Sequence, residues 1–168
     1  IDAIRAGIFY IPEDRKQQGL CVRMGVGYNL TLPNLDMVST FRFVVSKKKE
    51  YVQSNKIVED LKIKTPGLQQ FVKNLSGGNQ QKIVVGKWLM RSAQIVIFDE
   101  PTRGIDVAAK IEIYTIMNDL KKRGIGVLFI SSELPEVIGM SDRVIVMCNG
   151  RITANLKTKE TNQGQKRD

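Results

Sequence analysis

Histidine is absent from the 168-residue sequence, which removes the side chain most often used for general acid–base catalysis near neutral pH. Cysteine is scarce, and Cys21 and Cys148 stand far apart and outside any paired spacing. That spacing argues against a zinc site or a disulfide framework and favours free or buried thiols in a reducing compartment. Long apolar runs are missing too: IGVLFI, at residues 125–130, is far too short to cross a bilayer.

The composition is that of a folded domain with an excess of basic residues. Hydrophobic residues make up 42% and charged residues 26% of the chain, which is enough for a buried core and unlike a disordered segment. The formal net charge of +9 is compatible with nucleic acid, an anionic membrane face or phosphate ligands. Much of the excess lies in short basic runs, at residues 47–49 and 121–123, for which a solvated helix face is favoured over a nucleic-acid patch.

The apolar pattern predicts an α/β core that is interrupted by a helical section. Residues 6–12, 94–100 and 125–132 have the continuous apolar character of buried strands. The last two flank an amphipathic helix at residues 106–124, and such a βαβ unit predicts parallel neighbouring strands. An Asn-Gly pair at residues 149–150, between two apolar runs, predicts a β-hairpin.

Four regions follow from these patterns. They are a core strand with its loop (1–14), the helical section (15–91), the rest of the α/β core (92–156) and a polar tail (157–168). In the helical section, helices are predicted at 46–63 and 76–91, while residues 20–45 are predicted to be irregular because of their glycines and Pro33. The expected apolar face of the first helix comprises Tyr51, Ile57, Val58 and Leu61. That of helix 106–124 comprises Val107, Ile111, Tyr114, Met117 and Leu120.

Two adjacent acids, Asp99 and Glu100, close the second predicted strand. Ligands of parallel sheets bind beyond the carboxyl ends of the strands, so these acids are candidates for function. Asp99 is suited to hold Mg²⁺ directly or through water, and Glu100 to polarise a water for attack on a phosphoryl group. Taken alone, the pair is equally consistent with a solvated turn that happens to be acidic.

The segment NLSGGNQQK, residues 74–82, offers a serine hydroxyl and two glycines directly before a helix. The start of a helix has free backbone N–H groups and about half a positive charge, which together suit a phosphate. Read alone, the same residues are more simply a helix cap at Ser76 with a glycine hinge.

The order of three motifs is far more specific than any one of them. LSGGNQQK (75–82), IVIFDEPTRGID (95–106) and ISSELPEV (130–137) together resemble the nucleotide-binding domain of ABC transporters, as signature motif, Walker B with D-loop, and switch loop. The resemblance covers nearly the whole chain. With EDRK at residues 13–16, it looks more specifically like the second ATPase half of monosaccharide importer ATP-binding proteins of the ribose, galactose and xylose type. It implies a P-loop NTPase-like ABC ATPase core with a parallel sheet, an inserted helical subdomain and a C-terminal β-hairpin.

The resemblance also implies roles for individual residues. Asp99 would serve Mg²⁺, Glu100 would be the catalytic carboxylate, and Asp106 would lie at a dimer contact. The residues that would contact the γ-phosphate of ATP are Ser76, Gly77, Gly78, Asn79 and Gln80.

The sequence departs from the family at three places. No G-x-x-x-x-G-K-[ST] occurs in it, and the nearest segment has Gln81 in place of the first glycine and Trp88 in place of the hydroxyl residue. We therefore expect a C-terminal fragment that lacks the P-loop. Glu13 stands where the family usually has glutamine, and Ser132 stands where the switch loop usually has histidine. Serine can hydrogen-bond a phosphate but cannot carry a positive charge, so this half's own composite site is expected to hydrolyse ATP poorly.

The function implied by the resemblance is energy coupling in a monosaccharide importer at the cytoplasmic face of the cell membrane. The expected partners are a second ATPase half, the membrane permease and, indirectly, a sugar-binding protein outside the cell, with no nucleic acid. The alternative is a soluble ABC-type ATPase that acts on nucleic acid or ribosomes, which the charge of +9 favours slightly. A third reading, a folded module that is not catalytic alone, is compatible with the first.

Overall fold

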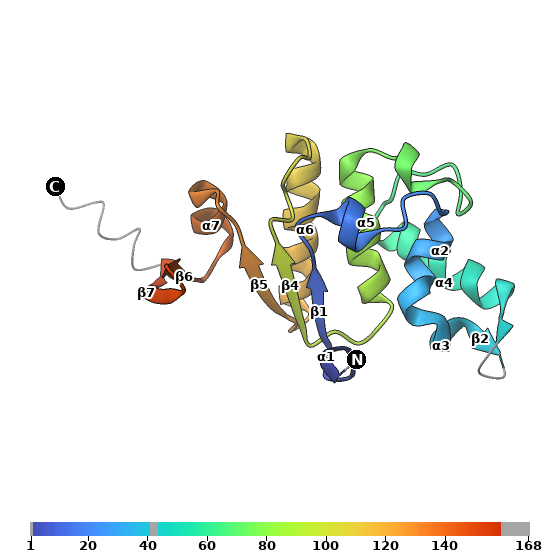
Figure 1. Ribbon diagram of the computed structural model, residues 1–168, viewed down its shortest axis with the longest axis horizontal. Helices are drawn as coiled ribbons and strands as arrows, with labels where there is room; N and C mark the ends of the chain where they lie inside the picture. Colours follow the sequence, from blue (N-terminus) through green and yellow to red (C-terminus); the bar gives the residue numbers. More distant parts are fainter. Residues whose placement is uncertain (1, 41–43, 159–168) are drawn as a thin grey trace. The chain divides into compact units, whose positions relative to one another are not determined.

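The computed structural model describes residues 2–40 and 44–158, and the chain forms two compact units, Ile1–Leu128 and Phe129–Asp168 (Figure 1). The strands of the described residues are β1 (Ile8–Ile11), β2 (Ser39–Thr40), β3 (Val44–Val45), β4 (Ile95–Asp99), β5 (Gly126–Ile130), β6 (Arg143–Cys148) and β7 (Arg151–Lys157). The α-helices are α1 (Asp2–Arg5), α2 (Val26–Thr31), α3 (Leu35–Val38), α4 (Lys47–Asp60), α5 (Gly77–Leu89), α6 (Val107–Lys122) and α7 (Leu134–Met140). Short turns of other helix types are η1 (Arg15–Gly19), η2 (Leu32–Asn34) and η3 (Val72–Asn74).

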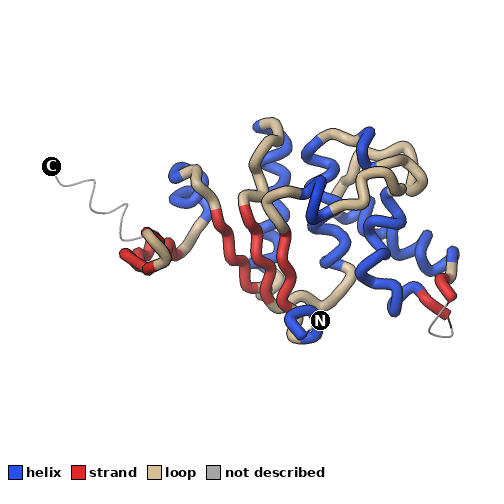
Figure 2. The backbone as a smooth tube through the Cα atoms, in the orientation of Figure 1, coloured by secondary structure: helices blue, strands red, loops and turns tan. Residues whose placement is uncertain are grey.

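A parallel sheet with the strand order β1-β4-β5 forms the centre of the fold. β1 pairs in parallel with β4, and the three arrows point the same way in Figure 1, with helices beside the strands in Figure 2. The predicted parallel βαβ unit is thereby confirmed. Its register brings Ile11 opposite Phe98, so the segments after both strands leave the sheet at the same edge.

One face of this sheet carries the core. Residues opposite each other in register lie on the same face, and Phe9, Ile11, Val96 and Phe98 are all buried there. The ring of Phe9 stacks on Trp88 of α5, with 5.1 Å between the ring centroids and 11° between the ring planes. This stack joins the sheet to the helix that begins at the signature segment, residues 75–82.

The helical section differs from expectation at residues 20–45, which carry α2, η2 and α3 rather than irregular chain. The glycines there permit close approach, not flexibility. A Cβ added to Gly25 would lie 2.8 Å from the carbonyl oxygen of Leu68, and one added to Gly27 would lie 3.3 Å from the Cβ of Leu68. The buried side chain of Asn29 then fastens the start of α2, because its amide donates to the carbonyl of Gly25.

The predicted apolar faces of two helices were partly wrong. On α4, Ile57 and Leu61 are buried, but Tyr51 is 64% exposed. On α6, the buried residues are Ala109, Ile113, Met117 and Leu120, whereas Val107 and Ile111 are 73% and 60% exposed. α6 packs along its Ala109–Ile113 side because α5 approaches it there through glycine, which admits a small residue that a count of large apolar residues overlooks.

The second unit contains α7 and the predicted hairpin. β6 and β7 are antiparallel, and Cys148 pairs with Arg151 across a two-residue loop. Asn149 and Gly150 in that loop have φ values of 50° and 74°, the positive angles that a type I′ turn requires. The hairpin predicted from the Asn-Gly pair is thus confirmed, and the reason is that both residues adopt positive φ angles.

Gly86 tests the packing of the helical section. Its substitution by alanine would bring a Cβ to 2.6 Å from Cγ2 of Ile57 and 3.1 Å from Cδ2 of Leu30. We expect Gly86→Ala to destabilise the protein by about 1–2 kcal/mol, since overpacking outweighs the gain in helix propensity. Gly139 of α7 has nothing within 4 Å of an added Cβ, so Gly139→Ala should stabilise by up to about 1 kcal/mol. Urea unfolding of the complete gene product measures both, and a gain at Gly86 would contradict the packing described.

Candidate functional site

The signature segment begins α5 with a serine cap. The exposed Ser76 hydroxyl accepts hydrogen bonds from the backbone N–H of Asn79, at 3.4 Å, and from its side-chain amide, at 2.9 Å. The side-chain oxygen of Asn79 in turn accepts from the backbone N–H of Lys64, at 2.8 Å. The capping prediction is confirmed, and Asn79 also ties the start of α5 to the segment after α4.

Gln80 has its side chain inside the protein. It is 3% exposed, and its amide nitrogen donates to the carbonyl oxygens of Val72, at 3.1 Å, and Leu75, at 3.2 Å. These bonds hold the chain that leads into the cap. The amide nitrogen of Gln80 thus has a structural use that the sequence alone did not reveal. The γ-phosphate contact expected of Gln80 stays a prediction.

The two signature glycines are enforced by close neighbours. A Cβ on Gly77 would lie 2.9 Å from Nη2 of Arg15 and 3.2 Å from Cγ2 of Ile105. A Cβ on Gly78 would lie only 2.5 Å from the Cβ of Ala109 on α6. The start of α5 is therefore pressed against both α6 and the loop of residues 101–106 that precedes it.

Asp99, at the end of β4, has a partner that the sequence did not suggest. The Tyr10 hydroxyl donates to Oδ2 of Asp99 at 2.6 Å. This hydrogen bond, more than burial or charge repulsion, raises the pKa of Tyr10 above its usual value. The strand register contains the signal: Tyr10 is opposite Ile97, and side chains two apart in a strand share a face, so Asp99 follows on the face of Tyr10.

Glu100 has a strained backbone, with φ at +44° in a residue that is not glycine. The turn it begins is closed by the N–H of Arg103, which donates to the carbonyl of Glu100 at 3.1 Å. Such a conformation costs on the order of 1–3 kcal/mol and persists where the surroundings impose it, often at functional positions. The half-buried carboxylate is thereby held just beyond the carboxyl end of the sheet.

Glu13 lies at the same edge, two residues beyond β1, and forms an ion pair with Arg103. The structure thus brings Glu13 together with the loop after β4, as their shared register predicts. Asp106 caps α6 by accepting from the N–H of Ala109 at 2.9 Å. Its expected dimer contact remains a prediction, as do the roles of Asp99 and Glu100.

Ser132 belongs to the second unit, where it follows β5. Its neighbour Ser131 organises this turn: the Ser131 hydroxyl accepts from the N–H of Glu133 at 3.0 Å and donates to Oε2 of Glu136 at 3.3 Å. Ser132, which stands where the resemblance would place a histidine, therefore lies in a hydrogen-bonded turn two residues before α7.

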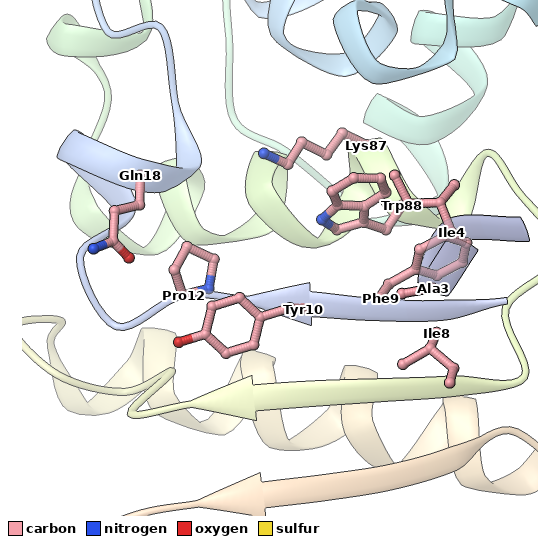
Figure 3. A pocket seen from close by; sticks show the side chains of 9 residues that line it. All are labelled: Ala3, Ile4, Ile8, Phe9, Tyr10, Pro12, Gln18, Lys87 and Trp88. Carbon is pink, nitrogen blue, oxygen red and sulfur yellow. The ribbon is translucent and has the colours of Figure 1, made fainter. Parts of the chain in front are cut away.

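A cavity of about 310 Å³ opens elsewhere, beside β1, α1 and α5 (Figure 3). Figure 3 shows Phe9 and Trp88 close together on its wall with Lys87 beside them, whereas Gln18 lies at the other end, beyond Pro12. The Lys87 amine is engaged with the carbonyl of Gly19 at 2.6 Å, and burial lowers its pKa. None of the residues predicted for phosphate or metal lines this cavity.

The acids fit one manner of holding Mg²⁺. Within residues 2–40 and 44–158, no three His, Cys, Asp or Glu residues cluster as a metal cage would require. Mg²⁺ commonly binds through one or two carboxylates plus substrate phosphates and water. Only one carboxylate oxygen of Asp99, Oδ2, is bonded to Tyr10. The second oxygen suits this mode of Mg²⁺ binding, in which the protein supplies one or two ligands, better than a cage made of protein ligands alone.

The comparisons with known proteins decide the family. The ABC transporter family description matches residues 2–103 of the chain. The chain belongs to the ABC transporter family. In the part of the chain that the structure describes, no helix combines the length and apolar character needed to span a membrane.

Curated relatives of this ABC protein include import ATP-binding proteins named for ribose and xylose. The chain is 51% identical, over 162 residues, to the ribose import ATP-binding protein RbsA of Clostridium perfringens. It is equally identical to the xylose import ATP-binding protein XylG of Thermoanaerobacter pseudethanolicus. Each match covers 96% of this chain but only 32% of the relative, so the chain spans about a third of the length of these proteins.

Solved structures confirm the ABC cassette fold. A nucleotide-free ATP-binding cassette from an ABC transporter matches with a TM-score of 0.78 at 24% identity, over 97% of this chain and 66% of the solved chain. A dimeric post-hydrolysis cassette bound to ADP and phosphate matches with a TM-score of 0.74 at 19% identity, over 94% and 66%. The predicted fold class is confirmed, including its partial extent relative to these chains.

Lys82, the last residue of the signature segment, gives a test of this packing. It is 2% exposed, and its amine donates to the carbonyl of Lys62 at 3.0 Å and pairs with Glu112 of α6 at 2.9 Å. We expect Lys82→Ala to cost about 2–3 kcal/mol, because a buried hydrogen-bonded ammonium and its packed stem are both lost.

Lys122→Ala is the matched control for this loss. Lys122 pairs with Asp119 at 3.3 Å, but their side chains are 78% and 50% exposed. Its removal should cost less than about 0.5 kcal/mol. Urea unfolding of the complete gene product compares the two variants, and equal losses would show that the burial of Lys82 contributes nothing.

Proposed function

We propose that this chain is part of the ATP-hydrolysing, energy-coupling subunit of a monosaccharide importer, of the second-half type, and that its signature segment completes an ATP site held by a partner half. The carrying observation is the start of α5, in a sequence without a P-loop motif: Ser76 is an exposed cap, Gly77 lies against loop 101–106 and Gly78 lies against α6. Names of relatives that import ribose and xylose support the substrate class.

In this proposal, the residues of α5 act as a phosphate-facing surface. Ser76 offers its hydroxyl, and the first turn of α5 offers backbone N–H groups that lack partners within the helix. The helix dipole adds positive potential at the same place. Glycine at residues 77 and 78 lets this first turn pack closely against loop 101–106 and α6, which hold it in place. Asn79 keeps the serine oriented through its 2.9 Å hydrogen bond.

The acids of the chain serve its own composite site. ATP with Mg²⁺, when bound, supplies the phosphoryl group that water attacks. Asp99 would hold the cation through its carboxylate, and Glu100 would orient the water and accept its proton. Glu13 is instead paired with Arg103, and Ser132 cannot supply the positive charge of a histidine. We therefore propose that this second site hydrolyses poorly.

The partners follow from this assignment. A second ATPase half, in the same protein or in another copy, holds the nucleotide that Ser76 faces, and Asp106 lies at their contact. The helical section, residues 15–91, faces a membrane permease at the cytoplasmic side of the membrane, and a sugar-binding protein acts through that permease. Closure on ATP and reopening after hydrolysis couple the cycle to transport.

The asymmetry between the two sites can be measured. In the complete gene product with its permease, Ser76→Ala should lower ATP turnover by at least about ten-fold, because a phosphate-facing hydroxyl is lost at the competent site. Glu100→Gln, an isosteric change, should lower it by less than about two-fold, because it affects the weak site. Steady-state ATPase assays and ATP-dependent uptake of labelled ribose, galactose or xylose provide the readouts. A larger loss with Glu100→Gln than with Ser76→Ala would show that this chain's own site does the hydrolysis.

An ATPase acting on nucleic acid is the alternative, motivated by the net charge of +9. Three of the cations, Lys82, Lys87 and Arg91, are engaged within the protein through bonds to carbonyl or amide oxygens and to acids. We therefore expect weak binding of the complete gene product to DNA and RNA at physiological salt. Fluorescence anisotropy over a salt series checks this, and tight binding that falls steeply with salt would favour the alternative.

A further inference from the structure

Arg15 joins three segments that the sequence motifs treat separately. It is the first residue of η1, directly after Glu13 and Asp14, and it lies against the start of α5 and the loop of residues 101–106. Its Nη1 donates to the carbonyl oxygen of Arg103 at 2.9 Å, and its Nη2 donates to that of Gly104 at 3.2 Å. The planar guanidinium thus bonds two consecutive carbonyls of one turn.

The same guanidinium borders the signature glycine. The nitrogen Nη2 that bonds Gly104 is also the atom that a Cβ on Gly77 would meet at 2.9 Å. Ile105 and the carbonyl of Gly104 close the other sides of Gly77, at 3.2 and 3.3 Å from that Cβ. Arg15 therefore fills the space between loop 101–106 and the first turn of α5.

The base of Arg15 is itself fixed. The Asp14 carboxylate accepts from the backbone N–H groups of Lys16 and Gln17, both at 3.0 Å, which sets the direction of η1. The far end of η1 is fastened to α5, because the Lys87 amine donates to the carbonyl of Gly19 at 2.6 Å. η1 thus lies along α5 and carries Arg15 with it.

A second interaction, an ion pair, joins the segment after β1 to loop 101–106. Glu13 pairs through its side chain with the side chain of Arg103, while Arg15 bonds the main chain of Arg103. Loop 101–106 is therefore held through both the side chain and the main-chain carbonyl of Arg103. The backbone has positive φ angles at Glu100, directly before this loop, and at Gly104 within it, of +44° and +66°.

We propose that Arg15 is a positioning residue, which fixes loop 101–106 against the first turn of α5 so that Ser76 and Asp106 form one rigid surface. Asp106 is the last residue of this loop, and Ser76 directly precedes Gly77. Arg15 touches neither nucleotide nor reacting atoms in this proposal; it acts through the carbonyls it holds. The inference rests on the proposed function, in which Ser76 and Asp106 face a partner ATPase half.

The test uses the complete gene product with its permease and three variants. Arg15→Gln removes the charge and the two-pronged donor, and Arg15→Lys keeps the charge as a point donor. Arg123→Gln is the matched control, because Arg123 is an exposed arginine at the end of α6. The readouts are kcat and KM for ATP, and amide hydrogen exchange of residues 101–106.

Arg15→Gln should lower kcat on the order of ten-fold, because misplacement of a catalytic surface reduces the rate of the chemical step. KM for ATP should stay within about two-fold, since no contact with bound substrate is lost. Arg15→Lys should recover part of kcat, and exchange at 101–106 should increase in the order wild type, Lys, Gln, with the control like wild type. Should Arg15→Gln fail to fold, Arg15→Lys carries the same comparison.

Three results would overturn the proposal. They are an unchanged kcat in Arg15→Gln, a raised KM with kcat preserved, which would mean a direct nucleotide contact, and equal exchange at 101–106 in every variant. Hydrogen exchange needs no turnover. A wild-type complex without ATP-driven uptake would therefore refute the proposed function, while the exchange data would still decide the role of Arg15.

Discussion

The close approach of α5 to α6 at Gly78 is the constraint on which the first unit depends. With only 2.5 Å between a hypothetical Cβ there and the Cβ of Ala109, no residue but glycine fits this geometry. That contact places the start of α5 beside the loop that leads into α6. Further along, the same helix stacks Trp88 on Phe9 of β1 and admits Ile57 of α4 at Gly86. The sheet, α6 and the helical section are thus all positioned with respect to one helix.

Four basic residues of this chain, Arg15, Lys82, Lys87 and Arg91, join segments that are distant in the sequence. Arg15 bonds the carbonyls of loop 101–106, Lys82 bonds the carbonyl of Lys62, and Lys87 bonds that of Gly19. Arg91, just after α5, donates to the Asn34 side chain and to a carbonyl in η2. A carbonyl accepts without neutralising the cation, whereas Lys82 and Arg91 are in addition paired with the carboxylates of Glu112 and Asp36. Part of the formal charge of +9 thus lies on cations that serve the packing of the fold.

The sequence predicted the parts of the fold that local patterns control. Apolar runs located the strands of the parallel sheet, Ser76 marked the start of α5, and Asn149 with Gly150 marked the hairpin, because each acts through its own backbone or its own periodicity. The failures have a common cause. α2 was missed because its glycines serve close approach to Leu68, and the buried face of α6 was misassigned because its contact is the small Ala109. Both depend on partners distant in sequence.

The candidate site shows the same division. Motif order identified the acids and the signature segment, but not their neighbours Tyr10 and Arg15, which reach them across about 90 residues of chain. Tyr10 could have been placed from the strand register once β1 and β4 were paired. Arg15 could not, since the direction of its side chain depends on the cap formed by Asp14 and on the packing of η1 along α5.

The signature segment therefore contains outward-facing and inward-facing residues, which the sequence motif alone does not distinguish. Ser76 faces outward, whereas Gln80 and Lys82 point inward and bond carbonyls of the chain around them. The inward residues fix the orientation of the helix whose first turn is offered to a phosphate. Because that helix is held by glycine contacts and buried polar bonds, its N–H groups need little reorganisation when a ligand arrives. In the proposed function, a helix start held in this way, more than any one phosphate contact, would let a segment without a lysine serve a nucleotide anchored by another ATPase half.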